Sequence, residues 1–246
     1  MKYIGSKNRI SKFIIPIMLN EAKEKGLKKW VEPFVGGGNV IDKIPKEFKK
    51  IGIDNNEYLI EMFKKMQEGW IPPDFISEDE WKNVKDKMDE VYEKHFIGFC
   101  RLGCSFGADW FGGYARNVKK DKPNAEILNS TTKSYCKQSK NNLLKQIPNL
   151  KDVDFRFGDY KEFDFENALI YCDPPYEGTI PYKGFEFNYC EFWEWVRKMS
   201  EKNTVFVSEY NAPNDFISVW EGEIKTNIAS QRKGAKNAVE KLFKLK

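Results

Sequence analysis

The run Ala168-Leu169-Ile170-Tyr171-Cys172, followed at once by Asp173-Pro174-Pro175-Tyr176, says most about the fold of this chain. An uninterrupted apolar run of this length is typical of a strand buried on both faces of a parallel sheet. The two prolines then fix φ and remove two backbone donors, which leaves carbonyl oxygens pointing outward from the strand end. With a carboxylate before them and an aromatic ring after them, this end suits a planar base that carries an amino group. An ordinary Asp-Pro turn is the alternative that the tetrapeptide alone leaves open.

Further strands are predicted on both sides of this run. Strand-like patterns occur at 30–34, 50–54, 153–157 and 204–208, and a C-terminal pair is expected around 219–229 and 238–245. Helical spacing of apolar residues is clearest at 8–25, 59–66 and 192–199. Because strands alternate with helices, we predict an α/β fold with a doubly wound, mostly parallel sheet. Ligands of such sheets bind at the carboxyl ends of the strands. The residues predicted to be neighbours there are Phe34, Asp54, Asp159 and Asp173.

The region between the strands at 50–54 and 153–157 has a different character. It begins with an amphipathic helix pattern, and Ser77-Glu78-Asp79-Glu80 forms a capping-box start to another helix. No strand-like pattern appears before Val153. We therefore predict a mainly helical domain at 57–148, inserted into a main domain formed by residues 1–56 and 149–246.

The bulk composition indicates a globular protein of a reducing compartment. The chain has 246 residues, of which 41% are hydrophobic and 32% are charged. No apolar stretch approaches the roughly 18 residues needed to span a bilayer. The first residues lack the apolar core of a signal peptide, and five irregularly spaced cysteines argue for free thiols. We expect a cytoplasmic protein with no membrane partner.

Positive charge is concentrated in two segments. Residues 116–145 carry eight Lys/Arg and two acidic residues, and residues 225–246 carry seven Lys/Arg and one Glu. Because the net charge is only +4, the rest of the chain is acidic. Two basic segments on an acidic body favour a polyanionic partner, while solvated surface lysine is the alternative for either segment alone.

A glycine loop follows the strand predicted at 30–34. Gly36-Gly37-Gly38 lets the backbone approach a ligand closely, but it is not the G-x-G-x-x-G of dinucleotide-binding proteins. Asp54 lies at the end of the next strand, near the position where a doubly wound fold places its ribose-binding acid. The loop alone is explained equally well by a tight structural turn. Together, the loop and the acid indicate a nucleoside cofactor.

Four motifs occur in an order that resembles a known family. They are Tyr3-Ile4-Gly5-Ser6-Lys7, Glu32-Pro33-Phe34-Val35-Gly36-Gly37-Gly38, Gly158-Asp159-Tyr160 and Asp173-Pro174-Pro175-Tyr176. Spread over nearly the whole chain, they resemble the Dam-type (D12 class) DNA adenine-N6 methyltransferases. The resemblance implies a Rossmann-like methyltransferase fold, S-adenosylmethionine as cofactor and duplex DNA as partner, with the insertion as target-recognition domain. Such an enzyme would act in the cytoplasm of a bacterial or phage-infected cell, with no obligate protein partner.

The resemblance also implies roles for the matching residues. Those implied in cofactor binding are Tyr3, Lys7, Glu32, Phe34, Gly36, Gly38, Asp54, Asp159, Tyr160 and Asp173. Those implied in catalysis, which would hold the target adenine, are Asp173, Pro174 and Tyr176. The Asp173 carboxylate and the Pro174 carbonyl would accept hydrogen bonds from the amino group, and Tyr176 would stack on the base. Residues 177–190 would either close over the base or pack beneath it.

The sequence departs from the family pattern in three places. Tyr3 stands where these enzymes often carry Trp, and residues 99–116 only loosely match the DNA-contacting stretch of the family. Ser208-Glu209-Tyr210-Asn211 replaces the usual Ser-Asn pair. The first two departures leave the target sequence open, and the third leaves open one wall of the base pocket.

The insertion supplies candidate DNA contacts. Arg101 and Arg116 flank an aromatic and glycine-rich stretch that would enter a groove or fill the gap left by a flipped base. The residues expected to contact phosphates are Lys119, Lys120 and Lys122, with Lys133, Lys137 and Lys140. The alternative is that Trp110, Phe111 and Tyr114 form a small core of the insertion.

Other chemistries are less favoured by the sequence. His95 is the only histidine, and its scattered placement relative to Cys100, Cys104 and Cys136 lacks the spacing of a zinc site, so we predict no metal. Amine methylation needs no strong base, because the amine can lose its proton after attack. The competing functions are methyl transfer to another amine (cytosine N4, RNA adenine or a glutamine amide), and a catalytically idle DNA-binding module of the same fold.

Overall fold

The computed structural model describes residues 1–105, 112–115, 135–178, 187–224 and 238–246. The chain divides into two compact units by its internal contacts. The first unit comprises Met1–Arg9, Val35–Lys43 and Gly52–Gly158, and the second comprises Ile10–Phe34, Ile44–Ile51 and Asp159–Lys246. The segment 57–148 falls wholly within the first unit, and its boundaries as a separate domain stay a prediction.

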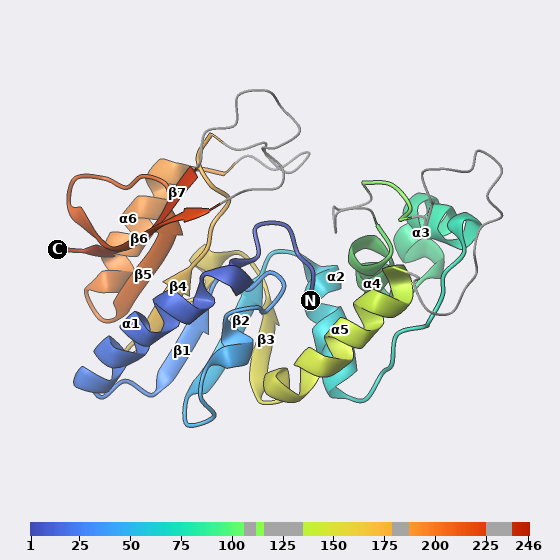
Figure 1. Ribbon diagram of the computed structural model, residues 1–246, viewed down its shortest axis with the longest axis horizontal. Coiled ribbons are helices and arrows are strands. Elements are labelled where there is room, and N and C mark those ends of the chain that lie inside the picture. Colours follow the sequence, from blue (N-terminus) through green and yellow to red (C-terminus); the bar gives the residue numbers. More distant parts are fainter. Residues whose placement is uncertain (106–111, 116–134, 179–186, 225–237) are drawn as a thin grey trace. The chain divides into compact units, whose positions relative to one another are not determined.

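A mostly parallel sheet forms the framework, as the sequence predicts (Figure 1). Within the described residues it has seven strands in the order β3-β2-β1-β4-β5-β7-β6. The bounds are β1 Lys29–Glu32, β2 Lys49–Asp54, β3 Val153–Phe157, β4 Leu169–Cys172, β5 Thr204–Glu209, β6 Phe216–Ile224 and β7 Ala238–Leu245. β4 pairs in parallel with β1 and β5, whereas β7 is antiparallel to both β5 and β6. The predicted α/β fold class is therefore confirmed.

The strand β4 is buried from end to end. Leu169, Ile170 and Cys172 have no exposed surface, and Tyr171 is 2% exposed. Leu169 lies between Trp30 of β1 and Thr204 of β5, and Ile170 lies between Val31 and Val205, so β4 has a strand on either side. A continuous apolar run is what such a position requires, because both faces of a central parallel strand are covered.

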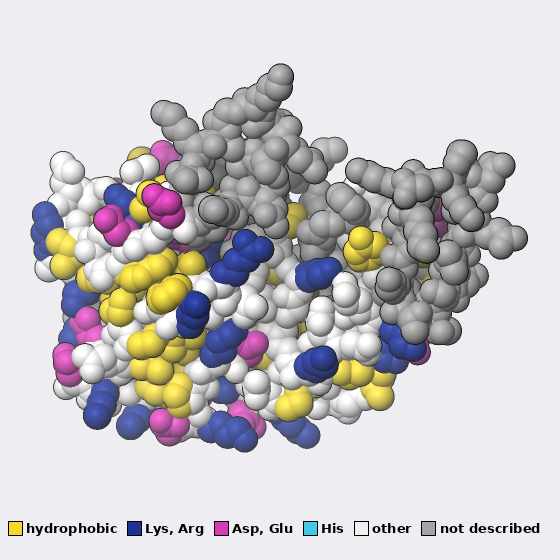
Figure 2. Space-filling view, viewed as in Figure 1, with side chains coloured by type: hydrophobic (Ala, Val, Ile, Leu, Met, Phe, Trp, Pro, Cys, Tyr) yellow, Lys and Arg dark blue, Asp and Glu magenta, His cyan; other side chains and the backbone are white. Residues whose placement is uncertain are grey.

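Two helices of the second unit pack against the sheet through aromatic contacts with β6. α1 (Ser11–Glu24) contacts β6 through stacked rings of Phe13 and Trp220, 6.1 Å apart. α6 (Tyr189–Ser200) contacts the start of β6 through the rings of Trp193 and Phe216, 4.7 Å apart. Figure 1 shows α1 in front of the strands and α6 behind them. Phe13 stays half exposed, and Figure 2 shows apolar side chains gathered over this part of the surface.

The described residues between β2 and β3 are mainly helical, as predicted. The helices are α2 Glu57–Gln67, α3 Glu78–Val91, α4 Lys94–Gly103 and α5 Tyr135–Leu150. Asn56 caps α2 and Ser77 caps α3, because each side chain accepts a hydrogen bond from a backbone N–H of the first turn. α2 packs on β3 through the stacked rings of Phe63 and Phe155, 4.7 Å apart. The predicted start of a helix at Ser77 is confirmed.

The end of β1 and the start of β6 differ by two and three residues from those expected. β1 ends at Glu32, before Pro33, since proline has no N–H to continue the ladder. β6 begins at Phe216, three residues earlier than expected, because this buried residue pairs with Leu245. An irregularity between Ser218 and Trp220 shifts the β6 register and breaks the alternation on which the sequence pattern depends.

Candidate active site

The strand end at Asp173 belongs to the second unit. β4 stops at Cys172, opposite Val207 of β5, and the chain then runs out of the sheet through the two prolines. Asp173 is partly exposed, whereas Pro174 is buried. The pKa of the buried Cys172 thiol is raised well above its usual value, first by burial and then by the Asp173 charge. Asp173 thus adds negative charge to the carboxyl end of β4.

Tyr176 is fixed by two neighbours. Its hydroxyl donates a hydrogen bond of 2.6 Å to Glu240 Oε1 of β7, and its ring meets the ring of Tyr210 edge-on at 4.7 Å. Only 9% of Tyr176 is exposed. Burial raises the pKa of Tyr176, and the charges of Asp173 and Glu240 raise it further, so the hydroxyl stays a donor. Stacking of this ring on a base stays a prediction.

Glu209, at the end of β5, joins this cluster, although no sequence motif predicted a role for it. Its Oε2 accepts a hydrogen bond of 3.1 Å from the backbone N–H of Glu177, and its Oε1 accepts one of 2.7 Å from Tyr210. Burial raises the pKa of Glu209 to about 7, against the lowering effect of these two hydrogen bonds. The only sequence signal was the departure at residues 208–211 from the family pattern.

Aromatic rings surround Phe34 just after β1. The ring of Phe34 lies 5.2 Å from Tyr160, 5.7 Å from Phe192 and 5.9 Å from Phe187. Tyr160 is 6% exposed and belongs to the short 3₁₀ helix η4 (Tyr160–Glu162). The second unit therefore brings together Phe34 and Tyr160, two residues that the family resemblance implies in cofactor binding.

The two remaining acids predicted in the second unit have local partners. Glu32 is 3% exposed and accepts a hydrogen bond of 2.9 Å from the Trp30 indole. Asp159 starts η4 in a capping box, in which its side chain accepts from the Lys161 backbone and its own N–H donates to Glu162. These contacts fix both carboxylates, and their predicted cofactor contacts stay predictions.

The glycine loop lies in the first unit and packs against Tyr3. Gly36 has φ +47° and Gly38 has φ +65°, in the left-handed region that favours glycine. A Cβ at Gly36 would lie 2.8 Å from the Tyr3 ring, and one at Gly37 would lie 2.7 Å from Tyr3. The loop therefore requires glycine for both its backbone conformation and its contact with Tyr3.

Asp54 closes the glycine loop from the end of β2. Its Oδ2 accepts from the Gly36 N–H and its Oδ1 from the Asn56 N–H, each at 2.9 Å. Burial raises the pKa of Asp54 to about 6, although the two hydrogen bonds act in the opposite direction. The first unit thus brings Tyr3, Gly36 and Asp54 together. A carboxylate has about four acceptor sites, so these two bonds leave capacity for ligand hydroxyls.

Lys7, from the same N-terminal motif as Tyr3, is 7% exposed. Its Nζ donates a hydrogen bond of 2.8 Å to the Gly5 carbonyl, at a turn where Gly5 has φ +74°. The contact folds the N-terminal motif back on itself. Its predicted contribution to cofactor binding stays a prediction.

Gln146 of α5 supports the glycine loop, and the sequence did not reveal it. Its Nε2 donates hydrogen bonds of 3.0 Å to the carbonyl oxygens of Gly37 and Gly38. Gln146 is 6% exposed, and the neighbouring Leu150 side chain lies 3.4 Å from where a Cβ at Gly38 would be. A lone glutamine in a polar stretch carries no motif, so only the folded chain identifies this contact.

The predicted DNA contacts are only partly described by the structure. Arg116, Lys119, Lys120, Lys122 and Lys133 lie outside the described residues. Lys137 and Lys140 pair with Asp74 at 3.6 and 2.9 Å. On the face shown in Figure 2, the Lys and Arg side chains of the described residues are spread out among acidic ones.

Arg101 is placed inside α4 rather than on an open surface. It is 9% exposed, and its guanidinium group lies 5.2 Å from the centre of the Tyr58 ring. Burial lowers the pKa of Arg101 to about 10, a value at which the side chain is still charged at neutral pH. Contact with a base edge would require this side chain to leave Tyr58, and the predicted DNA contact stays a prediction.

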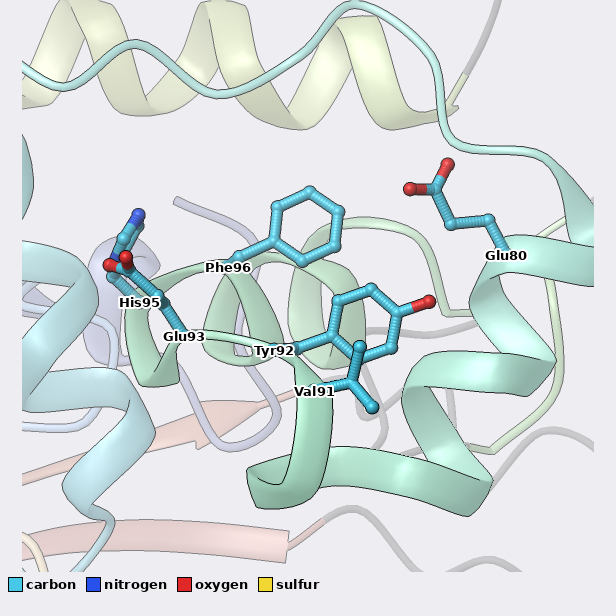
Figure 3. A pocket seen from close by; sticks show the side chains of 6 residues that line it. All are labelled: Glu80, Val91, Tyr92, Glu93, His95 and Phe96. Carbon is cyan, nitrogen blue, oxygen red and sulfur yellow. The ribbon is translucent and has the colours of Figure 1, made fainter.

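A pocket of about 440 Å³ opens in the first unit between α3 and α4 (Figure 3). Its lining residues are Glu80, Val91, Tyr92, Glu93, His95 and Phe96. The rings of Tyr92 and Phe96 stack with their centres 5.8 Å apart, and Nδ1 of His95 lies 3.3 Å from Oε2 of Glu93. None of the residues predicted to bind cofactor, base or DNA lines this pocket.

The described part of the chain contains neither a cluster of metal-binding side chains nor a helix that could span a membrane. No three His, Cys, Asp or Glu side chains lie where they could hold a metal ion. No helix in this part of the chain has the length and apolar character needed to cross a membrane.

Comparison with known proteins bears on the family directly. The family model of the D12 class N6 adenine-specific DNA methyltransferases matches residues 3–197. The Type II methyltransferase M.MjaIII of Methanocaldococcus jannaschii is 26% identical over 268 residues, covering 94% of this chain and 91% of the relative.

Two solved structures are also similar to this chain. One is a methyltransferase candidate, YhhF of Escherichia coli, with 8% identity and a TM-score of 0.40 over 95% of this chain and 84% of that one. The other is a methylase candidate, HI0767 of Haemophilus influenzae, with 10% identity and a TM-score of 0.39 over 96% and 88%. Both scores are too low to carry an argument, so the family rests on the match over residues 3–197. On that match, the chain belongs to the D12 class N6 adenine-specific DNA methyltransferase family and is an adenine-specific DNA methyltransferase.

Proposed function

We propose that this enzyme transfers a methyl group from S-adenosylmethionine to the N6 amine of an adenine flipped out of duplex DNA at a specific site. The observation that carries the proposal is the strand end after β4. There, Asp173 and Pro174 offer oxygen acceptors, while Tyr176 is held by Glu240 and Tyr210. This arrangement is suited to an amino group on a planar base.

The glycine loop supports S-adenosylmethionine as the cofactor. Gly36 and Gly38 adopt left-handed conformations, and Asp54 holds the loop closed at the carboxyl end of β2. Such a bare backbone beside a strand-end acid fits the amino acid and ribose of a nucleoside cofactor. When bound, the cofactor supplies a methyl group activated by a positively charged sulfur. The residues proposed to hold it are Tyr3, Lys7, Glu32, Phe34, Gly36, Gly38, Asp54, Asp159, Tyr160 and Asp173.

The proposed chemistry on the amine is positioning rather than strong base catalysis. The Asp173 carboxylate and the Pro174 carbonyl accept the two N–H groups of the amine, which draws the nitrogen lone pair out of conjugation with the ring. That lone pair would form the new N–C bond while the S–CH3 bond of the cofactor breaks and its electron pair stays on sulfur, and the amine would then release one proton to solvent. No histidine is needed for this step, since the nitrogen becomes acidic once it is methylated.

Base flipping follows from the place of the acceptors. An amino group paired inside a duplex cannot reach a strand end of a folded protein, so the base must leave the stack at a cost of a few kcal/mol. Contacts to DNA phosphates offset this cost. We assign them to the basic segments, with Lys119, Lys120 and Lys122 as the proposed residues, and we propose Arg101 and Arg116 as contacts to the groove or to the gap left by the flipped base.

Transfer of a labelled methyl group tests the function. Wild-type enzyme, Asp173→Ala and the exposed control Asp152→Ala are incubated with methyl-labelled S-adenosylmethionine and long unmethylated duplex DNA, and the digested nucleosides are separated. We expect N6-methyladenine from the wild type and the control, and at least about a hundredfold less from Asp173→Ala. If the label were found on cytosine, the target base would be cytosine rather than adenine, and the proposal would be wrong. No label together with retained DNA binding would favour an idle binding module.

A further inference from the structure

Two buried glutamates approach the segment that leaves β4. Glu209 ends β5, the strand paired in parallel with β4, and Glu240 lies in β7, the antiparallel neighbour of β5. Glu209 is 3% exposed and Glu240 is 4% exposed. A carboxylate is costly to bury unless hydrogen bonds compensate it, so the groups that these two side chains contact are the key to their role.

Both glutamates contact consecutive residues at the exit of the tetrapeptide. Glu240 accepts the Tyr176 hydroxyl at 2.6 Å, and Glu209 accepts the backbone N–H of Glu177 at 3.1 Å. Glu209 also accepts the N–H of Tyr210 at 2.7 Å, and the Tyr210 ring lies edge-on to Tyr176. The segment after Pro175 is thereby attached to two other strands through carboxylates rather than through a β-ladder.

We propose that Glu209 is a positioning residue that, together with Glu240, holds Tyr176 and Glu177 so that Asp173 and Pro174 keep the geometry needed to accept the target amine. The inference rests on the proposed function, because it assigns these two glutamates to the same amine site. Two prolines stiffen the segment between Asp173 and Tyr176, so anchoring its far end also restricts its near end. Misplacement of a reacting group by about 1 Å is enough to cost about a hundredfold in rate.

The contact of Glu209 depends on its charge. Three charged or titratable groups face Glu209. They are Asp173 and Glu177, in the segment that follows β4, and Tyr189, the first residue of α6. Burial raises the pKa of Glu209 to about 7, and the Asp173 and Glu177 charges raise it further. Protonation below that pH turns one carboxylate oxygen into a hydroxyl and weakens it as an acceptor, so the hold on Glu177 or Tyr210 loosens as the pH falls.

Steady-state kinetics distinguish positioning from a general structural role. Glu209→Ala, Glu209→Gln, Glu240→Gln and the exposed control Glu221→Gln are compared with wild type by label transfer to DNA. We expect Glu209→Ala to lower kcat by about tenfold to a hundredfold, with KM for S-adenosylmethionine within about twofold of wild type. Glu209→Gln and Glu240→Gln should keep part of kcat, because an amide oxygen still accepts one hydrogen bond. A kcat for Glu209→Ala within twofold of wild type would overturn the inference.

A second measurement tests the contact without using the reaction. In ¹⁵N–¹H spectra of the labelled protein, the amides of Glu177 and Tyr210 should titrate together near pH 7 in wild type, and this titration should vanish in Glu209→Gln. Absence of the titration in wild type would overturn the inference even if the variant were inactive. If instead the wild type labels no adenine, the proposed function fails, and the amide titration still reports whether Glu209 holds the segment.

Discussion

Gly36 combines two constraints, a left-handed backbone with φ +47° and contact with the Tyr3 ring. Gly36→Ala should therefore strain the loop and displace Tyr3, lowering stability by about 1–3 kcal/mol and weakening S-adenosylmethionine binding about tenfold or more. Gly26→Ala is the matched control, because Gly26 has φ +66° with nothing within 4 Å of the added Cβ. Thermal unfolding and titration calorimetry provide the two readouts. Equal behaviour of both variants would show that the Tyr3 contact is unimportant.

Asp54 should make stability depend on pH. Its pKa is raised from 3.8 to about 6 in the folded chain, chiefly by burial, so the native state holds its proton more tightly than the unfolded state. The resulting stabilisation is fully present below about pH 3.8 and is lost as the pH rises through about 6. Asp54→Asn should not lose stability in this way as the pH rises, because an asparagine side chain does not titrate.

The free energy of unfolding measured by urea denaturation tests this expectation for Asp54. As the pH rises from 4 to 7, the free energy of unfolding of Asp54→Asn should increase relative to that of wild type by on the order of 1–3 kcal/mol. This change with pH is independent of the constant difference in stability that the loss of one acceptor causes. A difference between the two proteins that stays constant over this range would contradict a raised pKa at Asp54.

Prediction from sequence succeeds where a residue acts through its own motif. The strand-end position of Asp173 and the tight loop at Gly36 both follow from local sequence patterns. Glu209 and Gln146 could not be predicted, because each bonds the backbone of a segment distant in sequence. Nearly every residue type carries a backbone N–H and carbonyl group, so the sequence does not show which backbone group a side chain will contact.

At the scale of the element, α5 supports the glycine loop through Gln146. Gln146→Ala would leave the buried carbonyls of Gly37 and Gly38 without this donor, at a cost of about 1–3 kcal/mol. We expect S-adenosylmethionine to bind at least about fivefold more weakly by calorimetry. Gln138→Ala on the same helix is the control, since it removes only an exposed contact with Lys2. If Gln146→Ala binds the cofactor as well as the control, the loop does not depend on α5.

The helix α4 lies in a part of the insertion for which the sequence indicated no individual helix. Its sequence contains Gly98 and Gly103, and all seven residues from Ile97 to Gly103 are buried. A Cβ at Gly98 would overlap the Tyr58 carbonyl of α2, so glycine is required there for close packing of the two helices. Low helix propensity at this position is thus offset by tertiary contact, which a propensity argument cannot see.

At the scale of the whole molecule, alternation of strands and helices was enough to predict the parallel part of the sheet but not its complete order. The sequence indicated a C-terminal pair of strands, yet β7 inserts between β5 and β6. Antiparallel insertion places Glu240 beside the segment that leaves β4, which gives Tyr176 its partner. Strand order depends on which edges remain open after the earlier strands have paired, and a hydrophobic pattern does not record this.

The uneven charge of the chain leads to a prediction about DNA binding. Residues 116–145 carry eight Lys/Arg against two acids in a protein whose net charge is only +4. If Lys119 and Lys120 contact phosphates, replacing both by Ala should weaken binding to all DNA sequences alike. It should also reduce the slope of log K against log salt concentration by about one to two, because fewer counterions are released.

The control variant for this prediction also loses two positive charges, but from a different part of the protein. Lys46→Ala with Lys49→Ala also removes two exposed lysines, but Lys49 is the first residue of β2, at the opposite strand end from Asp54. Fluorescence anisotropy with labelled duplexes at several salt concentrations gives both slopes. A general effect of net charge would lower affinity equally in the two double variants, whereas a phosphate interface at 119–120 changes the slope in only one. An unchanged slope for Lys119→Ala with Lys120→Ala would remove this segment from the DNA interface and leave the C-terminal basic segment as the remaining candidate.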